Sequence, residues 1–339
     1  MISFIHKNYF LTISIFFLFG FLFLLLSLTL GPGEITLNQV LGVLAGYDSA
    51  NNSLVHSLVW EIRLPRALLA MLIGASLGCA GTITQGIFQN PLASPNVLGL
   101  SYGAAVFVVL GIILGIDEMA LYITPFLAAL GAIFTFVLLY LFTLRSAGIF
   151  SLLLSGIAVS TIFSAVITLL LSLQIKDYEV TIKVMQWLMG NLEMKSWIHL
   201  KWIIIPVSLG ITGAFFLRRN LDVLHLGEET AASLGISFRY TYFLGVFFSA
   251  LLIGASTAVS GIIGFVGLVV PHLARLLIGA KHTKLIPFSI VLGAFFLLAV
   301  DVISRVTLKF YLPPGAVTSL IGAPVFLWLV QKNYRNHKV

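Results

Sequence analysis

Charged side chains are scarce in this sequence. Asp, Glu, Lys and Arg make up 9% of its 339 residues and apolar residues make up 59%, whereas an average soluble domain has about 25% charged residues. Apolar runs of about twenty residues recur from end to end, and a helix of that length crosses a bilayer core of about 30 Å. Because these runs lack the alternation of barrel strands, we expect an all-α polytopic membrane protein with a single transmembrane domain over residues 1–339.

Other absences argue against enzyme chemistry. Cys79 is the only cysteine, so a disulfide within the chain is excluded and a thiolate metal site is not expected. The sequence lacks the G-x-x-x-x-G-K-[ST] phosphate loop, and no His, Asp or Glu cluster with metal-ligand spacing lies within an apolar run. Asp301 and Arg305 are one helical turn apart, and we expect them to pair rather than relay protons. We therefore expect no enzyme activity, no metal and no cofactor in this chain.

The apolar runs predict about ten spans. The eighth is short and rich in Gly and Pro, so we expect it to be broken or half-buried. With both termini in the cytoplasm, Lys and Arg are more numerous inside than outside, as the positive-inside rule requires. This placement accounts for the net charge of +7 without nucleic acid. The predicted spans are residues 10–30, 65–86, 96–115, 120–142, 150–173, 198–217, 239–259, 262–279, 285–304 and 314–331.

An internal repeat is visible in the spans. The run from Ala70 to Ser76 is echoed by the run from Ala250 to Ser256, and the same offset aligns Pro91 with Pro271. An offset of five helices reverses direction in the membrane, as in the inverted repeats of transporters. We therefore expect repeat halves of about residues 1–175 and 198–331.

Polar motifs occur in a fixed order along the chain. They are Arg63-Leu-Pro-Arg66, Gln89-Asn-Pro-Leu-Ala-Ser-Pro95, Ser101-Tyr-Gly-Ala-Ala105, Leu154-Ser-Gly-Ile-Ala158, Gly227-Glu-Glu-Thr-Ala-Ala-Ser-Leu-Gly235, Gly264-Phe-Val-Gly-Leu-Val-Val-Pro-His-Leu-Ala-Arg275 and Pro314-Gly-Ala-Val-Thr-Ser-Leu-Ile-Gly-Ala-Pro324. This ordered set resembles the FecCD family of ABC permeases, from about residue 60 to the C-terminus.

The resemblance implies the permease of a type II ABC importer in a bacterial inner (plasma) membrane. Its expected partners are an ATP-binding cassette ATPase subunit, which holds ATP and Mg, a second permease copy or homologous permease, and an extracytoplasmic substrate-binding protein. The commonest cargo of the family is a ferric siderophore, and haem, cobalamin and oxyanions such as molybdate are alternatives. An ion-coupled secondary transporter would share the repeat, but it should need intramembrane acids, of which the spans offer almost none.

The segment of residues 221–236 carries the signals of a short helix. Carboxylates stand near its start and a glycine at its end, so it is either a simple amphipathic connector or, as the resemblance implies, the cytoplasmic coupling helix that docks in a groove of the ATPase. The candidate coupling residues are Asp222, Leu226, Gly227, Glu228, Ala231, Ala232, Leu234 and Gly235.

Three arginines are placed at outer helix ends. Arg63, Arg66 and Arg305 could snorkel to lipid headgroups, or meet carboxylates of a binding protein through bidentate pairs. The vitamin B12 permease of the family uses matching arginines to face its binding protein, so the resemblance favours docking.

The resemblance also implies a gate and a pathway lined by the fifth span and its neighbours. Apolar residues stand at the turn before that span, where the vitamin B12 permease has small hydroxyl residues, and this predicts an apolar gate that closes by dewetting. Glycines in the spans could alternatively serve close helix packing. The candidate residues are Gly148, Ile149, Phe150, Ser155, Gly156, Gln85, Asn90 and Pro91.

Overall fold

The computed structural model describes residues 9–47, 53–145, 149–174, 176–306 and 312–336, and these are helices joined by turns. The first half contains α2 (Tyr9–Thr29), α3 (Leu37–Ala45), α4 (Ser53–His56), the π-helix η1 (Ser57–Arg63), α5 (Leu64–Ile87), the 3-10 helix η2 (Pro95–Leu98), α6 (Leu100–Ile113), the 3-10 helix η3 (Ile116–Glu118), α7 (Ile123–Arg145) and α8 (Ile149–Leu173). The second half contains α9 (Tyr178–Leu188), α10 (Trp197–Leu224), α11 (Glu228–Ser233), α12 (Phe238–Ser260), α13 (Val266–Ile278), α14 (His282–Val306) and α15 (Pro314–Asn336).

Seven helical stretches in the described part of the chain are long and apolar enough to cross a membrane. Three shorter apolar helices accompany them: α6, α13 and the Pro314–Leu327 part of α15. These ten segments lie where the ten spans are predicted, although length and composition alone support seven crossings. The all-α polytopic fold is therefore confirmed, and the count of ten is compatible with it.

The eighth predicted span is broken, as expected. α12 ends at Ser260, Gly261 follows with φ 70°, and α13 begins only at Val266 after Phe265, a non-glycine residue with φ 64°. α13 is 13 residues long, or about 20 Å at 1.5 Å per residue, which is shorter than a bilayer core of about 30 Å. The irregular backbone before it lies within the protein, where membrane proteins tolerate such segments.

α5 is the central helix of the bundle. The helical stretch Leu54–Ile87 is 83% buried, against 22% for Thr12–Thr29 of α2 and 28% for Leu152–Leu173 of α8. α14 packs directly on α5: a Cβ atom added to Gly74 would lie 2.1 Å from the carbonyl oxygen of Gly293, and one added to Gly293 would lie 2.3 Å from that of Gly74. These two glycines let the helix backbones approach closely, which confirms the packing interpretation at this contact.

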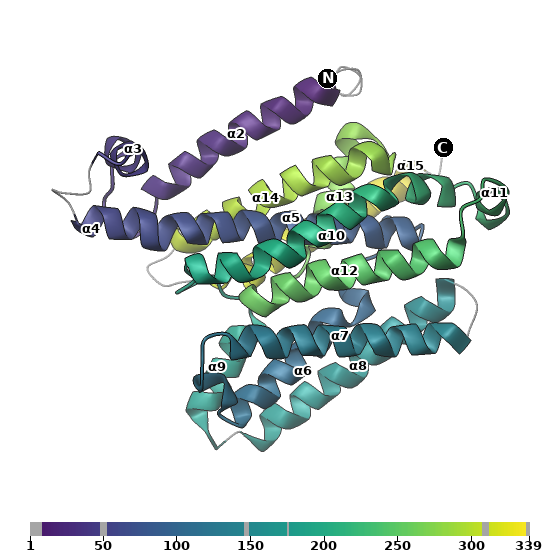
Figure 1. The fold of residues 1–339 in the computed structure, drawn as a ribbon, viewed down its shortest axis with the longest axis horizontal. Helices are drawn as coiled ribbons and strands as arrows, with labels where there is room; N and C mark the ends of the chain where they lie inside the picture. The colour runs from purple at the N-terminus through teal and green to yellow at the C-terminus, as the bar shows by residue number, and fades with distance from the viewer. Residues whose placement is uncertain (1–8, 48–52, 146–148, 175, 307–311, 337–339) are drawn as a thin grey trace.

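The helices that carry the repeated motif run in opposite directions. In Figure 1, α5 leads away from the end of the bundle that holds α3 and α9, and α12 leads away from the end that holds α11. The two helices nevertheless end differently, because α5 continues through Gly81 to Ile87, whereas the matching Gly261 terminates α12. The inverted repeat stays a prediction that this arrangement fits.

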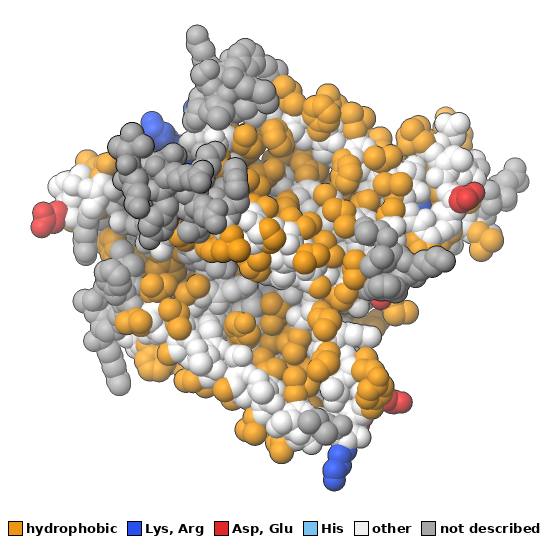
Figure 2. All heavy atoms as spheres, turned by 180° about the vertical axis from the view of Figure 1, so that it is seen from behind, with side chains coloured by type: hydrophobic (Ala, Val, Ile, Leu, Met, Phe, Trp, Pro, Cys, Tyr) orange, Lys and Arg blue, Asp and Glu red, His pale blue; other side chains and the backbone are white. Residues whose placement is uncertain are grey.

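The surface between the two ends of the bundle is apolar. Figure 2 shows hydrophobic side chains over most of one face and charged side chains at its margins. Large apolar side chains are exposed on α2 and α7, including Phe17, Phe19 and Leu141. Such a surface is stable only against lipid or another apolar protein surface, as a multi-pass membrane protein requires.

Candidate functional site

Arg63 ties the chain between α2 and α3 to the start of α5. Its Nη1 atom donates to the carbonyl oxygens of Leu28 (2.7 Å) and Thr29 (3.0 Å), and its Nη2 atom donates to those of Pro32 (2.8 Å) and Gly33 (2.9 Å). The residue is 4% exposed. In the described part of the chain, the hydrogen bonds of this buried guanidinium go to four carbonyl oxygens and to no carboxylate, and these four acceptors satisfy its donors.

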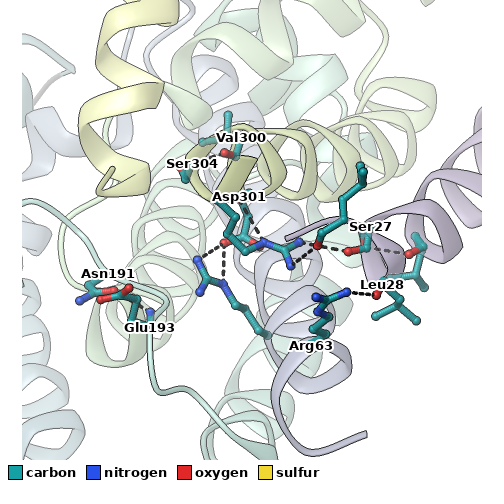
Figure 3. Close-up of polar contacts among 12 residues, drawn as sticks. Ser27, Leu28, Arg63, Asn191, Glu193, Val300, Asp301 and Ser304 are labelled. Atoms are coloured by element: carbon teal, nitrogen blue, oxygen red, sulfur yellow. Dashed lines mark hydrogen bonds and ion pairs between the residues drawn. The ribbon is translucent and has the colours of Figure 1, made fainter. Parts of the chain in front are cut away.

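Asp301 of α14 pairs with two arginines at the same end of the bundle (Figure 3). Its Oδ1 atom accepts a hydrogen bond from Nε of Arg66 (2.9 Å) and lies 2.8 Å from Nη2 of the same residue, and its Oδ2 atom lies 3.1 Å from Nε of Arg305. The carboxylate side chain is fully buried. The predicted Asp301–Arg305 pair is confirmed. The pairing of Asp301 with Arg66, 235 positions away along the chain, was not predicted.

These contacts give the three arginines a role within the chain. Arg305 also donates to the carbonyl oxygens of Ser27 and Leu30 of the first span. Together the guanidinium groups join α2, α5 and α14 beneath the end of the bundle that carries α3 and α9 (Figure 3). Docking of a binding protein by Arg63, Arg66 and Arg305 stays a prediction. If a binding protein docks there, the three arginines must contact it without losing the hydrogen bonds and ion pairs that they make within this chain.

The predicted helix of residues 221–236 is shorter than expected. α10 continues through Leu224, and a separate helix, α11, covers only Glu228–Ser233. Gly227 (φ 100°) and Gly235 (φ 77°) bound α11 in backbone conformations that L side chains rarely adopt. Of the two, only Gly235 was predicted as a boundary of this helix.

The surface of α11 combines one buried and several exposed side chains. Ala231 is fully buried against the bundle, while Ala232 and the flanking Leu226 (62%) and Leu234 (60%) are exposed. The side chain of Glu228 lies outside the described residues. Two leucines exposed at a bundle end form a candidate surface for a partner protein.

Asp222 does not belong to this short helix, which corrects its predicted place at the helix start, while its role in coupling stays a prediction. It lies in the last turn of α10 and faces the first turn of α14. Its Oδ1 atom accepts from the backbone N–H of His282 and lies 3.0 Å from His282 Nδ1, and its Oδ2 atom lies 3.3 Å from the Thr283 nitrogen. The reason is that residues 218–226 contain neither proline nor glycine, so α10 extends past the predicted boundary.

The predicted gate lies mostly outside the described residues. Gly148 is not described, and α8 begins at Ile149 without a description of the Ile149 and Phe150 side chains. Ser155 is half-buried on α8. Gly156 packs on η2, because a Cβ atom added to it would lie 2.4 Å from the Val97 carbonyl oxygen.

The other predicted pathway residues are dispersed. Asn90 and Pro91 lie in the turn between α5 and η2, where Asn90 Oδ1 accepts from the Leu92 N–H (2.9 Å). Gln85 is fully buried, donates to the Leu268 carbonyl oxygen (3.3 Å) and accepts from Arg275 (3.2 Å). The structure thus brings Gly156 to the segment that follows Pro91, whereas Gln85 joins α5 to α13.

A shallow, open depression, called the α8 groove from here on, lies on the exposed face of α8. It has a volume of about 710 Å³, and its described lining carries no charged residue. Ser160, Ser164, Thr168 and Ser172 recur every fourth position, which places their hydroxyls on one face of the helix. The full lining is Tyr102, Ser160, Thr161, Ser164, Ala165, Thr168, Leu169 and Ser172.

Three hydroxyls of this stripe use their protons within α8. Ser160 donates to the Gly156 carbonyl oxygen (2.7 Å), Thr168 to that of Ser164 (2.9 Å) and Ser172 to that of Leu169 (2.7 Å). Their oxygen lone pairs remain as acceptors toward the groove. This row of hydroxyls at residues 160, 164, 168 and 172 was not predicted to be functional, although its four-residue spacing places the hydroxyls on one face of a helix and is visible in the sequence.

The fold and these features define a multi-pass helical permease, and comparisons with known proteins agree. The FecCD transport family matches residues 18–332. The hemin transport system permease protein of Yersinia pestis is 39% identical over 83% of this chain and 85% of its own. The molybdate import system permease protein of Haemophilus influenzae is 33% identical over 93% of this chain and 95% of its own.

A solved structure has the same fold. A protein described as a metal-chelate type ABC transporter, in an inward-facing conformation, superposes with a TM-score of 0.83 at 31% identity, covering 96% of this chain and 99% of that one. This chain belongs to the FecCD transport family. It is the membrane-spanning permease of a type II ABC importer, in which ATP is hydrolysed by a separate subunit.

Proposed function

We propose that this permease carries a metal chelate of the ferric siderophore class into the cytoplasm. The observation that carries the proposal is the α8 groove, whose described lining combines hydroxyls, an aromatic ring and aliphatic side chains without a charge. A bare oxyanion such as molybdate is held by backbone N–H groups or cationic side chains, which the groove lacks. A bulky chelate that presents apolar and polar surface together suits a wide, uncharged path.

Relatives with different cargo set the alternatives. The hemin and molybdate permeases are both more than 30% identical to this chain, so overall identity does not separate the cargo classes. The metal-chelate type transporter that shares the fold favours a chelate. Haem and cobalamin remain the alternatives within this class.

The partners are proposed from the exposed features of the bundle. A second copy, or a homologous permease, faces the α8 groove so that the pathway closes between the two chains. The ATPase subunit docks at α11 on the cytoplasmic side, where both termini lie, and the binding protein docks at the opposite end of the bundle. ATP-driven movement of the two permeases then gives alternating access in a bacterial inner membrane.

Uptake by proteoliposomes tests the cargo class. The purified permease, its ATPase and its binding protein are reconstituted together, and accumulation of a ferric hydroxamate, haem, cobalamin and molybdate is measured with and without ATP. We expect ATP-dependent accumulation of the ferric hydroxamate. Ser164→Leu, which narrows the groove, should accumulate less of the ferric hydroxamate than the control Phe19→Leu on distant α2. Accumulation of molybdate alone would contradict the proposal.

A further inference from the structure

α14 is bonded at both of its ends to other helices. At its C-terminal end Asp301 pairs with Arg66 of α5, and at its N-terminal end His282 and Thr283 meet the Asp222 carboxylate of α10. Between these points α14 packs on α5 at the Gly74–Gly293 contact. α14 continues as one helix from His282 to Val306, with Pro287 inside it, so both attachments belong to one continuous element through which a displacement of one end can reach the other.

The bond at the N-terminal end of α14 is a helix cap supplied by another helix. The first N–H groups of an α-helix have no partner within it, and an anion at this position also interacts favourably with the helix dipole. Asp222 satisfies the N–H groups of both His282 and Thr283, and it also binds the His282 ring, which is fully buried. This carboxylate therefore fixes the last turn of α10 to the first turn of α14.

The same turn of α10 leads directly into α11. α10 ends at Leu224 and α11 begins at Glu228, so a short connection separates the Asp222 cap from the proposed docking helix. Gln89, which follows α5, donates to the Leu224 carbonyl oxygen (2.9 Å) and holds this turn from a second side. The buried Ala231 anchors α11 itself to the bundle. A force applied to α11 consequently acts on the turn that holds Asp222.

We propose that Asp222 is a positioning residue that links α11 to α14, so that movement imposed on α11 by the ATPase reaches the far end of the bundle. The inference rests on the proposed docking of the ATPase at α11. It assigns to one carboxylate the transfer of motion from the cytoplasmic loop to the helix that carries Asp301. Asp222 is part of neither the α8 groove nor the exposed surface of α11, so its proposed effect on transport is exerted only through α14.

A fluorescence experiment on the complete reconstituted transporter tests this link. Ile303→Cys places a thiol on the exposed surface near the far end of α14, and the native Cys79 is fully buried, so an environment-sensitive label reports on the introduced site. The label is followed on addition of ATP in the otherwise native chain, in Asp222→Ala and in Asp222→Asn. Asp177→Ala is the matched control, because Asp177 caps its own helix α9 through the Val180 N–H (3.2 Å) and joins no second helix.

We expect ATP to shift the label fluorescence in the native background and in Asp177→Ala. Asp222→Ala should lose the shift and reduce cargo uptake per ATP hydrolysed on the order of tenfold. Asp222→Asn should recover part of both, because an amide oxygen still accepts from the α14 N–H groups. If Asp222→Asn recovers part of the fluorescence shift and of the uptake, the hydrogen bonds to the α14 N–H groups are what matters at this site. If it recovers neither, the negative charge of Asp222 is what matters.

Two results overturn the proposal in different ways. If Asp222→Ala keeps the fluorescence shift and the native uptake, or if Asp177→Ala loses as much, Asp222 does not transmit the movement. If the native chain recovers no ATPase in a pull-down, the docking of an ATPase at α11 fails, and this inference fails with it. The pull-down is made first, so the two failures are distinguished.

Discussion

α14 is attached to neighbouring helices through a carboxylate at each end, and the two carboxylates, Asp301 of α14 and Asp222 of α10, are held differently. Asp301 is fully buried between two guanidinium groups, whereas Asp222 has a side chain 25% exposed and is held by backbone N–H groups and one histidine. A buried ion pair is costly to break, because removal of one partner leaves the other charged and unsolvated. A cap of backbone N–H groups breaks at lower cost. The comparison indicates a rigid attachment of α14 to α5 near Asp301 and an adjustable attachment of α14 to α10 near α11, so α5 and α14 are expected to move together.

The largest expected effect is that of Asp301→Ala. It leaves Arg66 and Arg305 charged without their carboxylate, and we expect a loss of about 3–5 kcal/mol in the free energy of unfolding. The midpoint of thermal unfolding in detergent measures it. Ser304→Ala is the control, because it removes one buried hydroxyl from the next turn of the same helix. Equal midpoints for the two variants would remove the distinction between the ends of α14.

Arg63→Lys tests whether geometry or charge holds the first span. Lysine keeps the positive charge, but its three donors cannot reproduce the planar fork that serves four carbonyl oxygens. We expect a loss of about 1–3 kcal/mol, measured by the same unfolding midpoint. The exposed Arg239, substituted in the same way, should have almost no effect. A fully stable Arg63→Lys would show that charge alone is sufficient.

Asp222→Ala should cost less stability than Asp301→Ala. It removes a partner from two backbone N–H groups and from the ring of the buried His282, but the Asp222 side chain itself is 25% exposed, and we expect a cost of about 1–2 kcal/mol. The ratio of the two midpoint shifts is therefore the sharpest stability test of the comparison. A larger shift for Asp222→Ala would reverse the assignment of the rigid and the adjustable end.

The last prediction concerns the pH dependence of two lysines outside the spans, near the Asp301 end. Burial lowers the pKa of Lys195 to about 8. Burial also acts against the charge of Lys183, but its hydrogen bonds to Asp117 and Glu118 outweigh it and raise its pKa.

The two lysines predict opposite pH dependence. Between about pH 8 and the unfolded pKa of about 10.4, the unfolded chain binds a proton at Lys195 that the folded chain does not, so stability rises with pH. Lys183 stabilises the fold below its unfolded pKa, and this contribution is lost as the pH rises through its raised pKa. Lys195→Met should therefore stabilise the protein at pH 7 and flatten the rise above pH 8. A profile unchanged by Lys195→Met would contradict the lowered pKa.

Local signals predicted much of the fold. The apolar runs located the helices, the Gly- and Pro-rich eighth span was broken as expected, and Gly235 follows the end of α11 as predicted. The contacts that define the two ends of α14 were not predictable in the same way. Arg66 and Asp301 are 235 positions apart, and no local pattern connects them. Asp222 was assigned to the wrong helix because an apolar window ends at charged residues, whereas α10 continues through them.

The candidate site was predictable only in part. The close packing at Gly74 was predictable from its glycine, whereas the functional roles of the predicted site residues stay predictions. The hydroxyl stripe of α8 was overlooked, since serine and threonine are frequent enough in membrane helices to go unnoticed. Which face of α8 stays exposed depends on how α6 and α7 pack against it, and this is a property of the assembled bundle.

Water access to α8 tests the central claim most directly. Ser164→Cys lies in the groove and Phe19→Cys on the exposed surface of α2, and the buried native Cys79 leaves the background unreactive. Both variants are treated with a membrane-impermeant, water-soluble thiol reagent in intact membrane vesicles and in the reconstituted importer. If the groove is part of the pathway, Ser164→Cys is modified at a rate that changes with ATP, modification blocks uptake, and Phe19→Cys is unreactive in lipid. If Ser164→Cys is as unreactive as Phe19→Cys in every state, α8 faces lipid and the proposed pathway is wrong.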